Sequence, residues 1–493
     1  MVPRLPRFPH SVVALLAGLA LVAAACSDPP TAGGRSAAPS DESGSDLPSC
    51  PLDALDNADG PVNITLWFGG IGSGGPARNT LDSMVQGFNQ SQDKVHLEAS
   101  DQGGSNAEVY RKFESAASAN RNQLPDVVYL ENTQLRVLHD SGLVLPAQSC
   151  MEADDYDVTN IKPSVRAAFS VNDVLYPGYM NATSQVLYFN KAHFAKAGLD
   201  PNAPPKTLDE LYEDAKALKA AGIPKPLAFK VSHTVFENWL GGAGVDMVNK
   251  NNGRDGVATE ATFDTPEAKD VLTLLKKMND EGLLNVFSPT EGGTDHYIAL
   301  ATQQSSMLIE TSTATSAIAQ FLGGNLTPAD VGSDVDTSKL ELQNLVPGTG
   351  FLPGVTEAGQ SAPGGTGFFI VAGDDKAKEA ASWMFLKYML QPENATAWHT
   401  GAGYLPILKS VDDQPDVQAF WQDNLAGALV KPAVDQLDDA DPDEPSPLIG
   451  PFPDYSDTIE GMIEAVLLEG KSTDSALKDA SDEVTASLQR YAG

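Results

Sequence analysis

The segment "ITLWFGGIGSGGPARNTLDSMVQGFNQ" (residues 64–90) places a glycine-rich loop between an apolar run and a helix-like segment. The apolar run is typical of a buried strand, and Pro76 suits the first turn of a helix. After it, apolar residues recur at helical spacing: Leu81, Met84, Val85 and Phe88. A strand, a glycine loop and a helix form the first unit of an alternating α/β domain. Ligands of open α/β sheets bind at the carboxyl ends of the strands, so we expect this loop to line a binding cleft.

The same loop satisfies the dinucleotide fingerprint G-x-G-x-x-G through Gly70, Gly72 and Gly75. Glu98 and Asp101 follow near the distance at which an acid would hold a ribose. A single match is weak in a chain with 43 glycines. The N-terminus also indicates export, away from intracellular dinucleotides. We therefore expect no nucleotide cofactor.

The first 25 residues predict a secretory signal peptide, because Arg4 and Arg7 precede the apolar stretch "VVALLAGLALVAAA" without any acid. Ala23–Cys26 resembles a bacterial lipobox, which predicts a diacylglyceryl group on the Cys26 sulfur. Residues 26–49 hold almost no large apolar side chain and predict a flexible tether. We expect an extracytoplasmic lipoprotein, anchored to the outer face of the cell membrane. The alternative is a plain signal that discards Cys26.

Cys50 and Cys150 remain as a pair if Cys26 is lipidated, and an oxidising compartment favours a disulfide between them. The bridge would close a loop of about 100 residues and stabilise the fold by about 4–5 kcal/mol in the chain-entropy model. It would fix the start of the folded region to the end of its first lobe segment. Two free buried thiols are the alternative.

The formal charge of −34 disfavours nucleic acid and anionic membrane surfaces as partners. The acidic run "DQLDDADPDE" (435–444) lacks the glycine and glutamate spacing of an EF-hand loop. The sequence also contains no H-E-x-x-H, C-x-x-C or G-x-S-x-G motif. We therefore expect no metal site and no catalytic triad.

Strand-like and helix-like segments alternate along the remaining chain, which predicts a mainly parallel sheet covered by helices. Thr207 and Glu210 form a capping box before a helix that starts at Leu208. Thr265 and Pro266 open another helix in the same way. The predicted strands are 62–68, 95–99, 125–131 and 186–190, and the other predicted helices are 107–120, 132–141, 191–199 and 374–390.

From about residue 60 onward, the chain resembles extracellular solute-binding proteins of ABC importers, of the carbohydrate type and most similar to the glycerol-3-phosphate-binding branch. The matching stretches are "QVLYFNKAHFAKAGLDPNAPPKTLDEL" (185–211), "NKNNGRDG" (249–256), "SSMLIETSTA" (305–314), "GGTGFFIVAG" (364–373) and "QPENATAWHTGAGYLPILKS" (391–410). The resemblance implies a monomeric binder that delivers solute to membrane permease subunits and performs no catalysis. It also implies a periplasmic-binding-protein fold: two hinge-linked α/β lobes with a ligand cleft between them.

We place lobe 1 at residues 50–178 plus 312–365 and lobe 2 at 179–311 plus 366–493. The expected crossings between lobes lie near 176–183, 310–312 and 364–367. Closure of the lobes around solute is the expected mechanism.

The resemblance assigns solute contacts residue by residue. Trp67 falls where the family has an aromatic residue after its first strand, and Phe68 adjoins it before the glycine loop. The remaining candidates are Glu131 or Asn132 after the third strand, Thr183, Thr311 and Ser312 at the hinge, Trp239 in a cleft wall, Gly365 and Tyr404. Hydroxyl-rich solutes need ring faces for their C–H groups and paired donors and acceptors for their hydroxyls. The alternatives are core roles for Trp239 and Tyr404, hinge-turn caps for the three hydroxyl residues, and a surface position for Glu131.

We expect the solute to be an uncharged sugar or polyol. The phosphate-binding branch carries an Arg in the segment aligned with "PSPLIGPFPDYSDT" (445–458), where this chain has Leu448, and no Lys or Arg lies between Lys431 and Lys471. The first alternative is glycerol-3-phosphate or a glycerophosphodiester, held by backbone N–H groups of residues 69–76 or by Lys230. Alternatives of other classes are an anchored extracellular glycoside hydrolase and a lipoprotein that only scaffolds a surface complex.

Overall fold

The structure is a computed structural model that describes residues 47–71, 75–289, 293–322 and 345–493. The predicted signal peptide, Cys26, most of the tether and Gly72 lie outside the described residues. Within them, the strands form two large sheets and one small pair, β5 (Ser170–Val171) with β6 (Val174–Leu175). None of the helices in these ranges is both long and apolar enough to span a membrane.

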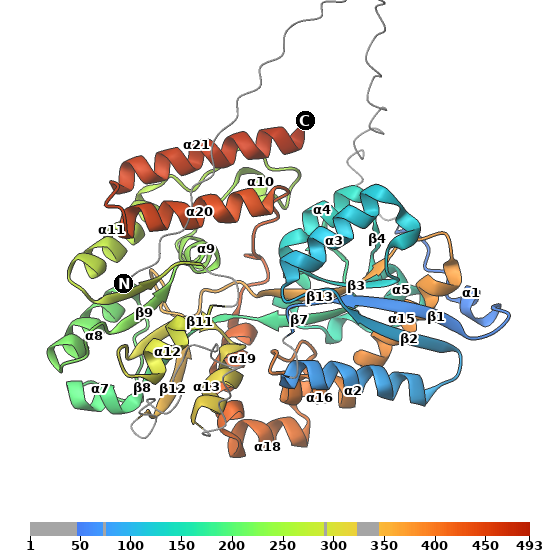
Figure 1. Ribbon diagram of the computed structural model, residues 1–493, viewed down its shortest axis with the longest axis horizontal. Helices are drawn as coiled ribbons and strands as arrows, with labels where there is room; N and C mark the ends of the chain where they lie inside the picture. The colour runs from blue at the N-terminus through green and yellow to red at the C-terminus, as the bar shows by residue number, and fades with distance from the viewer. Residues whose placement is uncertain (1–46, 72–74, 290–292, 323–344) are drawn as a thin grey trace, which may run out of the picture. The chain divides into compact units, whose positions relative to one another are not determined.

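The first sheet has the order β2-β1-β3-β13-β4, and β7 also pairs with β13 (Figure 1). β1 runs parallel to β2 and β3, whereas β13 runs antiparallel to β3, β4 and β7. Its strands are β1 (Val62–Phe68), β2 (Val95–Asp101), β3 (Val127–Glu131), β4 (Val144–Leu145), β7 (Tyr179–Thr183) and β13 (Gly364–Val371).

The second sheet has the order β10-β9-β11-β8-β12. β9 is parallel to β10 and β11, and β8 is antiparallel to β11 and β12. Each sheet thus contains one strand that follows a crossing from the other lobe and runs antiparallel to its neighbours. This strand is β13 in the first sheet and β8 in the second. The strands are β8 (Gln185–Asn190), β9 (Leu227–Lys230), β10 (Leu284–Phe287), β11 (Met307–Thr311) and β12 (Pro347–Phe351).

Helices cover both faces of the first sheet because its central strands are apolar on both sides. In β3, Val127 and Tyr129 pack into one hydrophobic cluster, while Val128 and Leu130 pack into another. The first cluster includes side chains of α2 and α15, and the second includes side chains of α3 and α4. The helices of this lobe are α1 (Asp53–Asp56), α2 (Pro76–Ser91), α3 (Asn106–Ala119), α4 (Leu135–Ser141), α5 (Ala147–Ala153), α6 (Pro163–Ala168), α15 (Lys376–Met389) and α16 (Pro392–Ala402).

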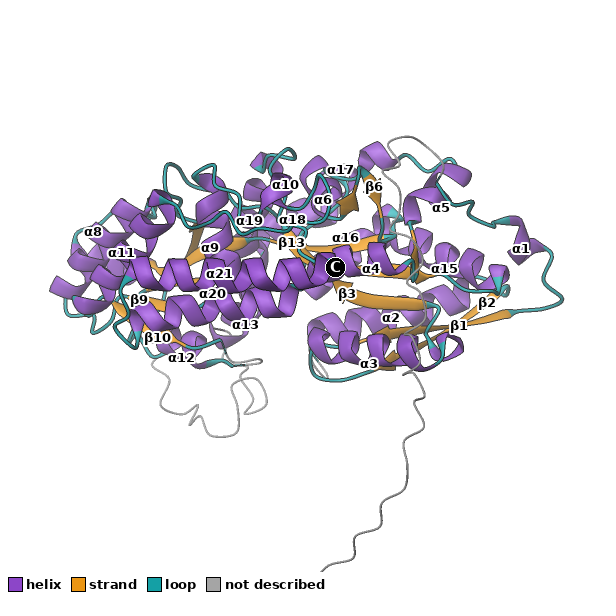
Figure 2. Cartoon of the chain, turned by 90° about the horizontal axis from the view of Figure 1, so that it is seen from above, coloured by secondary structure: helices purple, strands orange, loops and turns teal. Residues whose placement is uncertain are grey.

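The second lobe has its own core, in which α8, α9, α11, α20 and α21 contribute buried side chains. Figure 2 shows α20 and α21 side by side along this lobe, with α11 beyond them. Its helices are α7 (Lys191–Ala197), α8 (Leu208–Ala220), α9 (His233–Gly242), α10 (Asn249–Asn252), α11 (Pro266–Asp280), α12 (Asp295–Ala301), α13 (Ala314–Leu322), α19 (Leu425–Asp439), α20 (Phe452–Leu467) and α21 (Thr473–Ala492). α17 (Lys409–Asp412) and α18 (Pro415–Asp423) contact α16 and connect the first lobe to α19.

The predicted helix starts are confirmed by their caps. The Thr207 hydroxyl accepts from the Glu210 N–H of α8, and Thr265 caps α11 in the same way. The Glu210 carboxylate, however, accepts from the Lys206 N–H at 2.7 Å instead of the Thr207 N–H that a standard capping box uses. The cap is thus shared between two residues before the helix.

The predicted disulfide is present. Cys50 and Cys150 are bonded, with a sequence separation of 100 residues. Cys150 lies in α5 and Cys50 lies just before α1, so the bond fixes the first described residues to the first lobe. The alternative of two free thiols is thereby excluded.

The expected lobe boundaries are wrong in the second half of the chain. β12 (347–351) pairs with β8 of the second sheet, although 312–365 was assigned to lobe 1. β7 and β13 pair within the first sheet, and α15 packs on β1 and β13, although 179–183 and 366–389 were assigned to lobe 2. The reason is that β13 is a long-range antiparallel partner of β3, and local periodicity does not specify the sheet that such a strand joins.

The positions at which the chain crosses between the lobes therefore differ from those expected. The chain passes between the sheets at Ser184, again over residues 352–363, and again after α16, where α17 and α18 lead to α19 against β12. The expected crossing at 310–312 is absent, because β11 continues into α13, which also packs on α19.

Candidate functional site

The predicted contact residues concentrate where strands of the two sheets end and where the chain crosses between them. We call this set the interlobe region. It comprises residues 67–71, 131–133, 181–185, 230–233, 310–313, 364–366 and 404. The carboxyl ends of parallel strands are the usual ligand edge of an α/β sheet.

Tyr404 lies in this region as part of a hydrogen-bonded network. Its hydroxyl is 3.1 Å from the Tyr129 hydroxyl, and the Asn181 amide nitrogen donates to Tyr129 at 2.8 Å. Trp398 donates from its indole nitrogen to the Asn181 amide oxygen at 2.8 Å. The Tyr404 ring stacks on Trp398 with centroids 6.0 Å apart and an interplanar angle of 6°. One ring face is therefore fixed, and the residue is half-buried.

Burial raises the pKa of Tyr404, and the negative charge of Glu131 contributes in the same direction. The phenol is thus neutral at physiological pH and retains both donor and acceptor capacity. Glu131 follows Tyr129 by two residues in β3 and so lies on the same side of the strand, and the Tyr129 hydroxyl contacts that of Tyr404. Two of the predicted contact residues therefore come together.

The end of β3 distinguishes Glu131 from Asn132. Asn132 is buried, its amide oxygen accepts from the Gly365 N–H at 3.2 Å, and its amide nitrogen donates to Ser446 at 3.2 Å. Both ends of that amide are occupied by protein. Glu131 is half-buried and accepts from the Asn106 amide at 3.0 Å. Carboxylate oxygens accept more than one hydrogen bond, so Glu131 is the better candidate for solute contact.

Gly365 is placed by the crossing strands. Its φ is +127°, and a Cβ there would lie 2.0 Å from the Asn181 carbonyl oxygen. No other residue fits this close approach. Gly365 therefore brings β13 against β7 beside Asn132, and its role in the structure is to let the crossing close.

Charged groups of the second lobe meet at the ends of β9 and β11. The Glu310 carboxylate lies 2.9 Å from the His296 ring nitrogen and 3.9 Å from the Lys230 ammonium. Burial alone would raise the pKa of Glu310, but the hydrogen bond from His296 and the charge of Lys230 hold it below its usual value. Lys230 thus has a carboxylate near it already.

His233 begins α9, directly after β9. Its Nδ1 is 2.9 Å from a Glu460 oxygen. Burial would lower the pKa of His233, but the Glu460 hydrogen bond and the charges of Glu237, Glu460 and Glu131 raise it above its usual value.

The three predicted hydroxyl residues differ in their surroundings. Ser312 is fully buried, and its N–H donates to the Ser184 carbonyl at 2.8 Å, which supports the hinge-turn alternative for this residue. Thr311 is half-buried with its hydroxyl 2.7 Å from that of Thr313. Thr183 is half-buried at the end of β7, opposite Gly364. Thr183 and Thr311 retain the exposure that a solute contact requires.

Two predicted contact residues belong to hydrophobic cores. Trp239 is 1% exposed, stacks on Phe229, and donates from its indole nitrogen to the Pro353 carbonyl at 2.9 Å. The prediction that it lines a cleft wall is wrong, because α9 turns this residue into the second-lobe core. Phe68 is also 1% exposed, and strand alternation directs it to the opposite face from Trp67. Trp67 stays half-buried beside the α3 cluster.

The glycine loop has a packing explanation. Gly70 has a φ of +69°, and a Cβ there would lie 2.7 Å from the Asn106 amide oxygen. A Cβ on Gly69 would lie 2.7 Å from the Gly103 carbonyl oxygen. These glycines let the loop lie directly on the start of α3, which explains them without a nucleotide.

Sequence reasoning named Lys230 but missed Asn106, Tyr129, Asn181 and His233. Asn181 is a fully buried polar residue two positions before Thr183. His233 follows β9 (Leu227–Lys230), a strand that was not among those predicted, so its place after a strand end gave no signal. Tyr129 also gave no signal, because it lies inside an apolar run.

Arg254 lies beside the segment that contains Leu448. Its guanidinium donates to the carbonyl oxygens of Ala167 at 3.1 Å, Ser170 at 2.9 Å and Ser446 at 3.0 Å. Burial lowers the pKa of Arg254 to about 10. Leu448 itself is 3% exposed and packs into the α3–α4 cluster. The guanidinium is therefore committed to backbone carbonyls of both lobes.

The described residues contain no group of three or more His, Cys, Asp and Glu side chains arranged to hold a metal ion. Two hinge-linked α/β lobes with polar strand ends between them define the class of two-lobed solute-binding folds. The chain matches the family described as bacterial extracellular solute-binding protein over residues 83–426. It belongs to that family and is therefore an extracytoplasmic solute-binding protein.

Relatives and solved structures agree with this family. The chain is 25% identical over 460 residues to the sn-glycerol-3-phosphate-binding periplasmic protein UgpB of Escherichia coli K12, covering 89% of this chain and 95% of that protein. The cyclic alpha-maltosyl-1,6-maltose binding protein of Arthrobacter globiformis has a TM-score of 0.67 at 23% identity, covering 87% and 100% of the two chains. UgpB of Mycobacterium tuberculosis in complex with glycerophosphocholine has a TM-score of 0.67 at 18% identity, covering 88% and 100%.

Proposed function

We propose that this protein captures an uncharged sugar or polyol outside the cell membrane and delivers it to the permease of an ABC importer. Family membership supports the solute-binding role, and the relatives include binders of both an oligosaccharide and a phosphate ester. The choice between these two solute classes rests on the charges of the interlobe region.

The observation that carries the proposal is that the basic groups of this region already have partners. Lys230 lies near Glu310, and His233 is hydrogen-bonded to Glu460. Outside this region, Arg254 beside the Leu448 segment donates to three carbonyl oxygens. A phosphate needs a cation or converging N–H donors, whereas a hydroxyl-rich solute needs half-buried acceptors and ring faces. Glu131, Thr311, Tyr404 and Trp67 supply the second set.

In this proposal, Glu131 accepts hydrogen bonds from solute hydroxyls, and the free face of Tyr404 packs on the C–H side of the solute. Trp67, near the end of β1, adds a second ring. Thr183 and Thr311 contribute hydroxyls beside the crossings. Contacts from both lobes favour the closed arrangement, so solute binding shifts the population toward it.

The lipid anchor belongs to the same proposal. The Ala23–Cys26 sequence supports diacylglyceryl attachment at Cys26, with residues 26–49 as a tether that keeps the binder near its permease. Mass spectrometry of the protein from its native membrane fraction tests this part. An N-terminal Cys26 carrying lipid is the expected result, and an unmodified N-terminus elsewhere contradicts it.

A phosphate ester is the first alternative, held by backbone N–H groups near Gly69–Ile71 or by Lys230 released from Glu310. A glycoside hydrolase is the alternative of another class. A thermal-shift screen of the protein lacking residues 1–49 tests all three. We expect saturable stabilisation by a neutral sugar or polyol, without turnover. Stabilisation by phosphate esters alone, or release of chromophore from a glycoside, contradicts the proposal.

A further inference from the structure

β2 is the edge strand of the first sheet, since among the described residues its only strand partner is β1. An edge strand presents unpaired N–H and C=O groups along its outer side and can therefore pair with a strand of another molecule. In β2 the outward-facing backbone groups alternate with those that bond to β1. The backbone N–H and C=O groups of Val95 face outward, and so do those of Leu97 two residues later.

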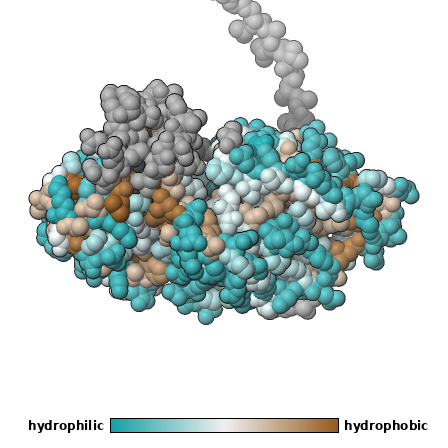
Figure 3. All heavy atoms as spheres, turned by 90° about the horizontal axis from the view of Figure 1, so that it is seen from below, coloured by the Kyte–Doolittle hydropathy of each residue, from teal (hydrophilic) through white to brown (hydrophobic). Residues whose placement is uncertain are grey.

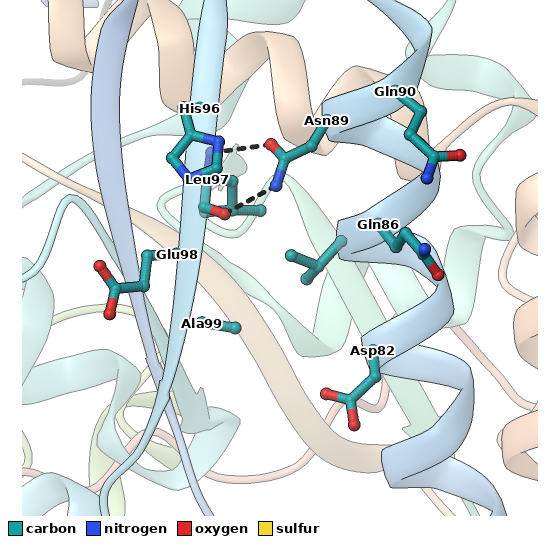
Figure 4. A pocket seen from close by; sticks show the side chains of 9 residues that line it. Asp82, Gln86, Asn89, Gln90, His96, Leu97, Glu98 and Ala99 are labelled. Carbon is teal, nitrogen blue, oxygen red and sulfur yellow. Dashed lines mark hydrogen bonds between the residues drawn. The ribbon is translucent and has the colours of Figure 1, made fainter.

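Two side-chain amides at the end of α2 bind these backbone groups: Asn89 in its last turn and Gln92 directly after it. The Asn89 amide nitrogen donates to the Leu97 carbonyl at 2.9 Å, and its oxygen accepts from the Leu97 N–H at 2.9 Å (Figure 4). Gln92 does the same for Val95, with both distances 2.8 Å. Each amide reproduces the donor–acceptor pair that a neighbouring strand would supply. The orientation of both amides is fixed, because a flipped amide would place like groups together.

The arrangement stops at a defined place along the strand. The next outward residue is Ala99, and beside it the surface has a hollow of about 420 Å³ lined by Asp82, Val85, Gln86 and Glu98, among others. In the part of the chain that the structure describes, no side-chain amide of α2 is hydrogen-bonded to Ala99. The α2 residue Val85, which has no amide side chain, lines the hollow together with Ala99. The two amides therefore cover Val95 and Leu97, the first two outward-facing residues of β2.

The sequence of β2 is suited to pairing with itself. In an antiparallel pair of two copies centred on Leu97, His96 of each copy would lie opposite Glu98 of the other, and Val95 opposite Ala99. His96 and Glu98 are exposed on the same face of the strand. The segment "VHLEA" also alternates apolar and polar residues, which favours a strand in either partner.

The rest of the described surface offers little else for self-association. Its exposed large hydrophobic residues are Val346 just before β12, Leu425 at the start of α19 and Leu468 just after α20. The face shown in Figure 3 carries hydrophilic residues with small scattered apolar areas. Pairing through β2 is thus the most direct route to a dimer.

We propose that Asn89 and Gln92 substitute for a neighbouring strand and prevent β2 of one copy from pairing with β2 of a second copy. The two amides satisfy the edge within the chain, so a second copy would have to displace four hydrogen bonds before it could form its own. The protein would thereby remain monomeric.

The test compares variants of the mature chain by size-exclusion chromatography with light scattering. In Asn89→Ala/Gln92→Ala both amides are lost, and we expect a concentration-dependent shift from monomer to dimer. Gln86→Ala/Gln90→Ala is the matched control, because these exposed amides lie on the same helix without bonding to β2, and it should remain monomeric. Adding Glu98→Lys to the first variant should restore the monomer, since His96 would then face a cation.

Hydrogen exchange shows whether the edge has opened. Faster exchange at the Val95 and Leu97 amides, together with an unchanged monomer mass at all concentrations, contradicts the proposal. So does a wild-type protein that is already dimeric. If the double variant does not fold, the single variants Asn89→Ala and Gln92→Ala each expose one residue, and a monomer mass for both contradicts the proposal equally.

Discussion

Trp239 and Tyr404 are aromatic residues chosen for the same role, and their burial separates them. Trp239 is 1% exposed within the second-lobe core, whereas Tyr404 is half-buried with one ring face on Trp398. A residue pattern indicates that an aromatic lies near a strand end. It does not indicate on which side of the helix or turn the ring lies, because that depends on packing partners distant in sequence.

Trp239→Ala should lower the free energy of unfolding by roughly 3–5 kcal/mol, since it removes a large buried side chain and leaves the Pro353 carbonyl without its donor. Urea unfolding measures the change. The remaining folded protein should bind solute as the wild type does. A variant with normal stability and impaired solute binding would show that Trp239 contacts the solute.

His399 links pH to stability beside Tyr404. Its Nδ1 donates to the Tyr404 carbonyl at 2.6 Å and its Nε2 accepts from Trp421 at 2.9 Å, so the ring must be neutral. Burial is the main cause that lowers its pKa to about 4. The unfolded state has a His pKa of about 6.5 and binds the proton first, so this contribution is complete above pH ~6.5 and decreases toward pH ~4.

The expected loss over that window is about 3 kcal/mol. His233 has a raised pKa and contributes with the opposite sign, so the comparison must be with a variant of His399 alone. Urea unfolding of the wild type and His399→Gln at several pH values measures the difference between them. The variant should lack this part of the pH dependence. Parallel curves for the two proteins would show that His399 is not the responsible group.

At the scale of elements, local sequence patterns predicted most of the strands and helices that they addressed. The strand at 62–68 and the helix caps at Thr207 and Thr265 are present because alternation, capping hydroxyls and proline act within one turn of the chain. The assignment of β13 and β12 to lobes failed for the opposite reason. Both are antiparallel partners of strands more than 150 residues away in sequence, and such pairing leaves no local signature.

The N-terminal cap of α8 should make a measurable contribution to stability. Thr207→Ala removes the hydroxyl that accepts from the Glu210 N–H and should cost about 1 kcal/mol of stability. Thr207→Ser retains the hydroxyl and is the matched control. Denaturant midpoints of the three proteins decide the matter, and equal midpoints for Ala and Ser would show that the Lys206–Glu210 bond suffices to start the helix.

At the scale of the whole molecule, the disulfide acts on the unfolded chain. Cys50–Cys150 closes a loop of 100 residues, and replacing both cysteines by Ser should lower stability by about 4–5 kcal/mol in the chain-entropy model. Comparison of the reduced wild type with the double variant separates loop entropy from side-chain effects. A double variant as stable as the oxidised protein would contradict this contribution.

The whole-molecule account predicts a protein that closes on a neutral, hydroxyl-rich solute. The family and the two lobes follow from the chain, but the solute depends on a few side chains whose charges are paired across elements: Lys230 with Glu310, His233 with Glu460, and Arg254 with backbone carbonyls. Only Leu448 and the absence of Lys and Arg between 431 and 471 indicated this from sequence. The pairings themselves required the structure.

Titration calorimetry against a panel of sugars and polyols, glycerol-3-phosphate and glycerophosphocholine tests this claim most directly. The account predicts saturable binding of a neutral sugar or polyol, weakened at least several-fold in Tyr404→Ala, and no binding of either phosphate ester. Saturable binding of a phosphate ester, with none of the neutral compounds bound, would contradict the account.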